Sequence, residues 1–152
     1  MSRREFWKLL SQFLQGGITI VMSTPYLDEA ERCGRIALLN EGRLLAVDAP
    51  GALRQSLPGT LMEVLLPRPR EAVNRLRAAG HQDAQVFGDR LHVWTDAADE
   101  GAARAYVARL AAAAGLPDYE ARPVVPSLED VFIAKVAAAP QGPPAEASRA
   151  HA

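Results

Sequence analysis

The sequence predicts a small α/β segment over residues 1–57, followed by an α+β unit of the order β-α-β-β-α-β over residues 59–138. Two observations predict this organisation. An apolar run at residues 18–22 is typical of a strand buried on both faces, as in a parallel sheet covered by helices. After Pro58 and Gly59, which mark a boundary, strand and helix patterns follow an order that closes its own core. Residues 139–152 are dominated by Pro, Ala, Gly and Ser, so we expect a disordered tail there.

The first segment opens with a helix. Ser2 and Glu5 have the spacing of a capping box, and glycines at residues 16–17 supply a C-terminal stop. Between them an apolar stripe recurs at helical spacing: Phe6, Leu9, Leu10, Phe13 and Leu14. The strand at residues 18–22 follows. The chain behind it offers only an antiparallel hairpin, so we expect its neighbours to lie upstream or to come from another molecule.

The segment after this strand predicts a short helix that ends near Gly34. Thr24 is expected to cap it, Pro25 suits its first position, and two acids, Asp28 and Glu29, lie near its positive end. Residues 35–40 and 43–48 then predict a hairpin, although the Glu-Gly turn between them is a weaker signal than Asn-Gly. Residues 50–57 predict a brief helix.

Residues 59–138 are predicted to contain strands and helices in the order β-α-β-β-α-β. Strands are predicted at residues 61–66, 84–87, 90–95 and 119–125, and helices at residues 69–79 and 100–114. The apolar faces of these helices, with Val73 and Leu76 on the first, are suited to packing on one side of a four-stranded antiparallel sheet. This is a ferredoxin-like arrangement. Ser127 is expected to cap a closing helix over residues 127–138.

Composition excludes several classes of function. The 17 basic and 18 acidic residues nearly cancel, so charge gives no support for nucleic-acid binding. The single cysteine, Cys33, excludes an internal disulfide, and no Cys/His group has metal-ligand spacing. The sequence has no apolar run long enough to span a bilayer and no signal-peptide pattern, which predicts a cytosolic chain.

Residues 19–46 resemble the ATP-binding subunits of ABC transporters, from the switch loop onward. The match is ordered: the strand, the loop at Ser23-Thr24-Pro25, the acidic helix start, and the hairpin with Glu41-Gly42-Arg43 at its turn. The ferredoxin-like unit and Pro126-Ser-Leu-Glu-Asp-Val-Phe-Ile133 resemble the C-terminal extension of exporter-type subunits of the daunorubicin-resistance and multidrug kind. The resemblance covers nearly residues 2–136 and implies a C-terminal portion of such a subunit.

The resemblance implies ATP and Mg²⁺ as cofactors of the full-length family. This chain contains no G-x-x-x-x-G-K-[ST] phosphate loop, no family signature and no magnesium-site strand, so neither cofactor is expected to bind it tightly and hydrolysis by it alone is not expected. The implied partners are an N-terminal half or a second nucleotide-binding subunit, a transmembrane permease subunit, and optionally a second copy in a homodimer, but no nucleic acid. The implied location is cytoplasmic, at the inner face of the cell membrane.

The switch loop departs from the family pattern, which usually has a histidine where this chain has Pro25. Proline has no side-chain donor and no backbone N–H, so Pro25 cannot take over that histidine's hydrogen bond to the terminal phosphate. We therefore expect no catalytic residue here, and Ser23, Thr24 and Pro25 are interpreted as a degenerate nucleotide-binding switch loop. Without the resemblance, the same three residues are an ordinary helix start.

Other residues have plainer interpretations. We expect the carboxylates of Asp28, Glu29 and Glu31 to interact electrostatically with the positive end of the helix rather than to serve as paired catalytic groups. His81, His92 and His151 are scattered, so we expect neither a metal site nor an acid–base pair from them. Cys33, Trp7 and Trp94 are expected to be packing residues. A second functional hypothesis is a non-enzymatic ferredoxin-like module that binds a ligand or partner, with a vestigial N-terminal segment.

Overall fold

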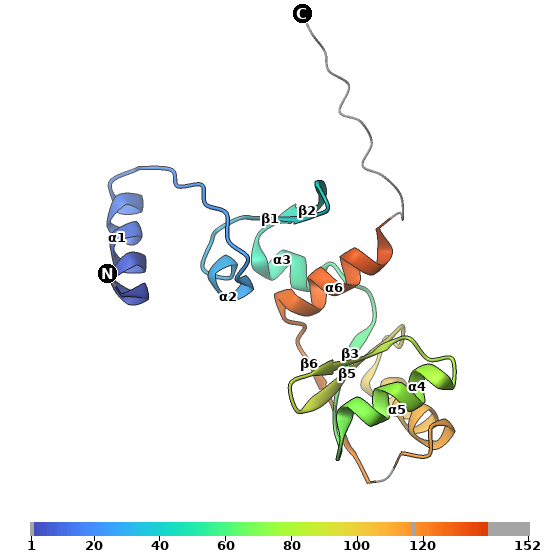
Figure 1. Cartoon of the computed structure of the whole chain (residues 1–152). Helices are drawn as coiled ribbons and strands as arrows, with labels where there is room; N and C mark the ends of the chain where they lie inside the picture. The colour runs from blue at the N-terminus through green and yellow to red at the C-terminus, as the bar shows by residue number, and fades with distance from the viewer. Residues whose placement is uncertain (1, 117, 140–152) are drawn as a thin grey trace, which may run out of the picture. The chain divides into compact units, whose positions relative to one another are not determined.

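The computed structural model describes residues 2–116 and 118–139, and it is a small α/β fold with two antiparallel sheets (Figure 1). The chain divides into two compact units, residues 1–32 and residues 33–152. Most of the predicted disordered tail, residues 140–152, lies outside the described residues.

The first unit begins with α1 (Arg3–Gln15), and both ends of this helix follow the sequence prediction. The Ser2 hydroxyl accepts a hydrogen bond from the Glu5 N–H, and the Glu5 carboxylate accepts one from the Ser2 N–H, which completes the capping box. At the other end Gly17 has a φ of +82°. The Gly17 N–H donates to the Leu14 carbonyl, and the Ile18 N–H donates to the Phe13 carbonyl. These bonds form a Schellman motif, which satisfies carbonyls that the last turn would otherwise leave unpaired.

The strand predicted at residues 18–22 is absent, so that prediction was wrong. The backbone between α1 and α2 (Leu27–Ala30) has no ladder partner among the described residues. The exposed fraction is 54% for Ile18 and 94% for Val21. An extended segment becomes a strand only when a neighbour supplies its hydrogen bonds, and no other described segment of the chain supplies them here.

The second unit starts with a hairpin of β1 (Ile36–Asn40) and β2 (Arg43–Asp48). The two strands pair antiparallel, with an irregularity between Leu38 and Leu39. Both turn residues have positive φ, +49° at Glu41 and +74° at Gly42. A two-residue turn of this kind matches the twist of the flanking strands, so the predicted hairpin forms although glutamate is an unusual residue in that conformation.

The remaining elements agree with the predicted ranges to within two residues at each end. They are α3 (Pro50–Gln55), β3 (Thr60–Leu65), α4 (Pro69–Ala78), β4 (Ala84–Phe87), β5 (Arg90–Thr95), α5 (Glu100–Ala113), β6 (Glu120–Val124) and α6 (Leu128–Ala138). The four strands form an antiparallel sheet in the order β4-β5-β3-β6, with β3 and β5 at its centre. Both α4 and α5 cover one face of this sheet, as Figure 1 shows.

The main core lies between that face and the two helices. Alternate residues of the central strands point into it, including Met62 from β3 and its cross-strand partner Val93 from β5. Val73 and Leu76 of α4 meet them, as predicted from the helical spacing. The residues of α5 that are buried are Ala103, Val107, Leu110 and Ala111.

On the opposite face of the sheet, Asp130 of α6 contacts His92 of β5, and α6 itself packs against α3 and β2. Its Leu128 and Val131 are buried, as are Leu61 on the same face of β3 and Leu53 of α3. This face also carries the polar side chains Glu63, Arg90 and His92, because alternate residues of a strand point to opposite faces of the sheet.

Candidate functional site

The predicted switch-loop residues lie in the extended stretch that leads into α2. Ser23 and Pro25 are exposed and Thr24 is half-buried. The Thr24 hydroxyl accepts a hydrogen bond from the Tyr26 N–H at 3.1 Å and donates to Glu29 Oε2 at 2.7 Å. This local turn holds Pro25 outside the helix. The helix therefore starts at Leu27 with Tyr26 in the cap position, and the prediction of Thr24 as cap and Pro25 as first residue was wrong.

The acids of α2 are held by the first helix of the same unit. Arg3 Nη2 donates to Asp28 Oδ2 at 2.6 Å, and Arg3 Nε donates to Glu29 Oε1 at 3.1 Å. The Asp28 hydrogen bond, first among the causes, raises the pKa of Arg3 above its ordinary value. Trp7 lies in the same unit, with the Arg32 guanidinium 5.3 Å from its ring centroid. This network orders residues 24–32 around a loop whose central residue, Pro25, has no donor to offer a ligand.

A second group of polar residues, which we call the sheet cluster, was missed by the sequence analysis. It consists of Glu63 (β3), Arg90 and His92 (β5), Arg122 (β6) and Asp130 (α6). Arg90 Nη1 donates to Glu63 Oε2 at 2.9 Å, and Arg122 Nε donates to Glu63 Oε1 at 2.7 Å. The His92 and Asp130 side chains meet at 2.6 Å between Nδ1 and Oδ1. Only 8% of the Asp130 side chain and 9% of the His92 side chain are exposed.

The electrostatics of the sheet cluster keep its carboxylates ionised. The hydrogen bond from Arg90, together with that from Arg122, holds the pKa of Glu63 below its ordinary value despite burial. Burial alone would raise the pKa of Asp130, but the hydrogen bonds from His92 and Ser127 outweigh it, so the pKa is lowered. Because an ionised Asp130 can only accept, the proton of this contact is on His92 Nδ1. The ring is also stacked on Phe87, with centroids 4.2 Å apart.

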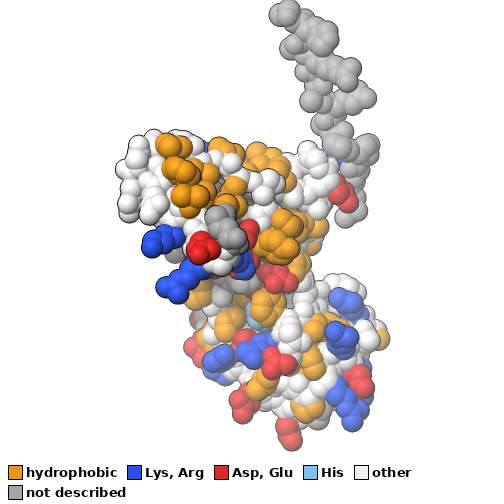
Figure 2. All heavy atoms as spheres, turned by 60° about the vertical axis from the view of Figure 1, so that its left-hand side comes forward, with side chains coloured by type: hydrophobic (Ala, Val, Ile, Leu, Met, Phe, Trp, Pro, Cys, Tyr) orange, Lys and Arg blue, Asp and Glu red, His pale blue; other side chains and the backbone are white. Residues whose placement is uncertain are grey.

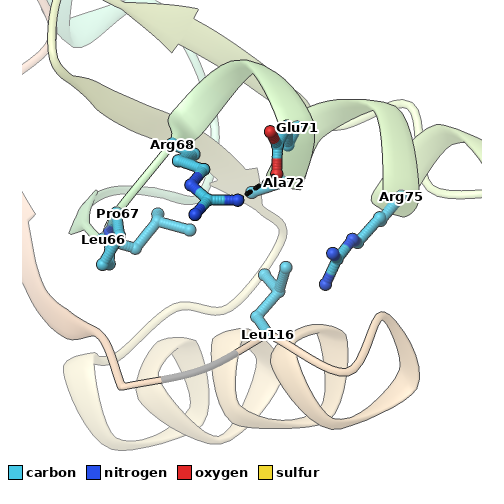
Figure 3. Close-up of a pocket in the computed structure, with 7 residues that line it drawn as sticks. All are labelled: Leu66, Pro67, Arg68, Glu71, Ala72, Arg75 and Leu116. Carbon is cyan, nitrogen blue, oxygen red and sulfur yellow. Dashed lines mark hydrogen bonds and ion pairs between the residues drawn. The ribbon is translucent and has the colours of Figure 1, made fainter.

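Two hollows lie on the second unit, and neither contains the sheet cluster. The first has a volume of about 250 Å³ and lies between the end of β3, α4 and Leu116, as Figure 3 shows. The two arginines that line it already have partners: Arg68 pairs with Glu71 at 3.4 Å, and Arg75 donates to the Gly115 carbonyl at 3.5 Å. The second, about 490 Å³, lies beside Trp94, α3 and the β6–α6 connection. Trp94 Nε1 is satisfied there by the Pro58 carbonyl at 2.9 Å.

The histidines whose positions the structure describes do not form one group. His92 joins the sheet cluster, His81 lies after α4, and His151 is outside the described residues. Within the described part of the chain, no group of His, Cys, Asp and Glu could hold a metal ion. Among residues 2–116 and 118–139, no helix is both long and apolar enough to cross a bilayer. Acidic and basic side chains are interspersed on the face drawn in Figure 2.

Comparison with known proteins gives the relatives of the chain. Over 140 residues it is 31% identical to the probable multidrug ABC transporter ATP-binding protein YbhF of Escherichia coli. It is 32% identical over 139 residues to the daunorubicin resistance ATP-binding protein DrrA2 of Streptomyces coeruleorubidus. The chain is similar to ATP-binding proteins of ABC transporters. A third relative, the Nod factor export ATP-binding protein I of a Rhizobium species, is 37% identical over 134 residues. No protein-family model matches the chain.

These relatives are much longer than the chain. The matches take in 88%, 87% and 87% of this chain, but only 22%, 42% and 41% of the respective relatives. The chain therefore spans about two fifths of the daunorubicin and Nod factor proteins and about one fifth of the E. coli protein. One continuous similarity extends across both compact units, so the second unit is part of what the chain shares with these proteins.

Proposed function

We propose that this chain is the C-terminal part of an exporter-type ABC transporter ATP-binding subunit. In this proposal, residues 1–57 correspond to the nucleotide-binding domain from its switch loop onward, and residues 59–138 to a ferredoxin-like extension. The observation that carries the proposal is the similarity of nearly nine tenths of the chain to three differently named ABC ATP-binding proteins. The names of these relatives refer to multidrug transport, daunorubicin resistance and Nod factor export, so the proposal extends to export but not to a particular cargo.

The topology of residues 60–124 supports the ferredoxin-like part of the proposal. The elements β3-α4-β4-β5-α5-β6 follow the order β-α-β-β-α-β, with the first and third strands at the centre of the sheet. Both helices pack on one face, and the residues of the core come from all six elements or their immediate flanks. We propose that residues 59–138 are regulatory or dimer-forming in the assembled transporter.

The uncovered apolar surface of the first unit supports its assignment to a larger domain. No residue of α1 is buried, and the exposed fraction is 44% for Phe13 and 56% for Leu14. With Ile18 and Val21 they leave apolar side chains open to water, of the kind visible in Figure 2. We propose that an N-terminal half of the nucleotide-binding domain covers this surface, and that a permease subunit is the membrane-embedded partner at the inner face of the cell membrane.

The proposed subunit uses ATP and Mg²⁺, but the groups that would hold them are not in this sequence. A phosphate loop supplies backbone N–H groups and a lysine, and a separate strand supplies the acids for the metal and the attacking water. The contribution of this chain is the loop at Ser23, Thr24 and Pro25. Since Pro25 has no donor, we propose that the loop forms a weak hydrolytic site and that nucleotide does not bind tightly to this chain alone.

A non-enzymatic binding module is the second candidate. It is favoured by the closed core of the second unit and by the hollow of about 490 Å³ beside Trp94. A chimera tests between the two candidates: this chain replaces the matching segment of the Rhizobium relative, and Mg-ATP binding and turnover are measured. Measurable turnover, lost when the phosphate-loop lysine of the chimera is changed to alanine, is expected if the chain is a transporter ATPase segment. A chimera that folds and binds Mg-ATP but shows no turnover above the lysine variant would favour the module.

A further inference from the structure

The hollow of about 250 Å³ beside α4, which we call the arginine hollow, has an apolar floor and a charged rim (Figure 3). Leu66 and Ala72 in its lining are buried, and Leu116 is half-buried and packs against the main core. The rim consists of charged side chains from α4 and from the residue before this helix. An apolar lining with a few convergent polar groups is the usual composition of a site for a small molecule.

The floor of the arginine hollow is fixed by the ends of two elements. Leu66 directly follows β3, and Leu116 follows the end of α5. The Leu116 N–H donates to the Ala111 carbonyl at 2.9 Å, and the Gly115 N–H donates to the Ala112 carbonyl at 3.2 Å. With a φ of +57° at Gly115, these bonds form a Schellman motif, which holds Leu116 against the core. The apolar floor is therefore already formed before any ligand is present.

The two arginines of the rim make only long contacts. Arg68 Nη1 lies 3.4 Å from Glu71 Oε2, and Arg75 Nη1 lies 3.5 Å from the Gly115 carbonyl oxygen. Charge-assisted hydrogen bonds between nitrogen and oxygen are usually about 2.7–2.9 Å long. Both guanidinium groups can therefore gain shorter hydrogen bonds from an added acceptor. Because two guanidinium groups face one carboxylate, the rim also has an excess of one positive charge.

The backbone at Arg68 has an unusual conformation. Its φ is +54° and its ψ is +61°, which is the left-handed region that residues other than glycine rarely adopt. Pro69 follows, and a proline disfavours the right-handed helical conformation in the residue before it. The side chains of Arg68 and Arg75 both point toward the space above Leu116, as Figure 3 shows. Strained residues of this kind are concentrated at binding sites, so the conformation of Arg68 supports a role for its side chain.

We propose that the arginine hollow binds a small amphipathic monoanion, namely a carboxylic acid with a short apolar chain. The guanidinium groups of Arg68 and Arg75 donate to the carboxylate, and the apolar chain lies on Leu66 and Leu116. The excess of one positive charge matches a monoanion. The volume of about 250 Å³ is below the roughly 300 Å³ at which sites for drug-sized ligands begin, so the chain has only a few carbons. The site lies within residues 66–116 and does not depend on either proposed function.

The test is an NMR titration of the full chain with sodium hexanoate, followed through the backbone amides. Hexanoate should cause saturable shifts at the amides of Arg75 and Leu116, with a dissociation constant of the order of 1 mM, because so small a ligand buries few atoms. Acetate should bind about tenfold more weakly, since it lacks the chain that reaches the apolar floor. Hexylammonium has the same chain with the opposite charge, and it should cause no saturable shift at these amides.

Two variants of exposed arginines on α4 locate the site. Arg75→Gln should weaken hexanoate binding about tenfold, because the carboxylate loses one charge-assisted hydrogen bond. The matched control is Arg70→Gln, which changes an exposed arginine of the same helix that does not line the hollow, and it should leave the affinity unchanged. The proposal would be overturned by the absence of saturable shifts with hexanoate, by equal binding of hexylammonium, or by unchanged affinity in Arg75→Gln. Tighter binding of inorganic phosphate than of hexanoate would also overturn it, because the apolar floor would then play no part.

Discussion

Gly59, which precedes the central strand β3, is a position where one added methyl group should strongly destabilise the second unit. Its φ is +86°, a conformation that costs an L-residue roughly 1–2 kcal/mol. A Cβ on Gly59 would also lie 2.1 Å from the carbonyl oxygen of Thr95 and 3.1 Å from the Cα of Asp96. These are backbone atoms of the neighbouring strand end, so no side-chain rotation can relieve the overlap.

The expected magnitude follows from these two effects. Forcing extra volume into a packed position costs roughly 1–3 kcal/mol, and with the backbone strain Gly59→Ala should lower the free energy of unfolding by roughly 2–5 kcal/mol. Gly88→Ala is the matched control. Gly88 also has a positive φ, +61°, but a methyl group added there would meet nothing within 4 Å, so only the strain of roughly 1–2 kcal/mol applies.

Urea unfolding followed by tryptophan fluorescence measures both costs. Trp94 lies on β5 beside the Pro58 carbonyl and reports this region directly. All variants carry Trp7→Phe, so that the signal comes from Trp94 alone and not from the first unit. Equal midpoints and slopes for Gly59→Ala and Gly88→Ala would refute the close approach of Gly59 to the Thr95 backbone.

Three further outcomes follow from the second unit. Ser127→Ala should lower the free energy of unfolding by about 1 kcal/mol, because the Ser127 hydroxyl caps α6 by accepting a hydrogen bond from the Asp130 N–H. The control in the same urea assay is Ser11→Ala, which lies within α1 and away from both ends of that helix. Acid should destabilise the second unit, because folding lowers the pKa values of Glu63 and Asp130. The stability that these two carboxylates contribute is present above their ordinary pKa values of 4.5 and 3.8, and it is lost as the pH falls through the lower folded values. Glu63→Gln should therefore flatten the pH profile of unfolding, measured by circular dichroism, in that range. Burial and the hydrogen bond to Asp83 raise the pKa of Tyr106 to about 12, so a tyrosinate absorbance step near that pH should disappear in Tyr106→Phe. Persistence of the step in this variant would contradict its assignment to Tyr106.

Local patterns predicted most of the fold. The capping box at Ser2, the expected cap at Ser127 and the glycines after α1 are each local patterns, and each placed a helix end correctly. The helical spacing of Val73 and Leu76 placed both in the core. These features depend on backbone hydrogen bonds and side-chain spacing within a few residues, so they can be read without knowledge of distant contacts.

The errors arose where structure depends on distant partners. Residues 18–22 have a strand composition, but strand formation requires a neighbouring backbone that the described chain does not supply. The error at Thr24 has a local cause instead: its hydroxyl can cap a helix, yet it takes part in a turn with Tyr26, two residues away.

The sheet cluster was missed for a similar reason, since His92 and Asp130 are 38 positions apart. A signal for part of it existed. In the predicted order the first and third strands are neighbours, and Glu63 and His92 both alternate out of the apolar pattern on the face away from the helices. That pairing could have predicted the cross-strand contact between β3 and β5. The arrival of Asp130 could not be predicted in the same way, because it depends on where α6 packs.

The most direct test of the proposed function is the ATP turnover rate of the chimera with the Rhizobium relative, compared between the loop of this chain and its Pro25→His variant. Histidine should raise turnover, because it restores a donor for the terminal phosphate at a position where proline has none. Ser23→His is the control for adding an imidazole at a neighbouring exposed position. An unchanged or lower rate in Pro25→His would contradict the interpretation of residues 23–25 as a degenerate switch loop.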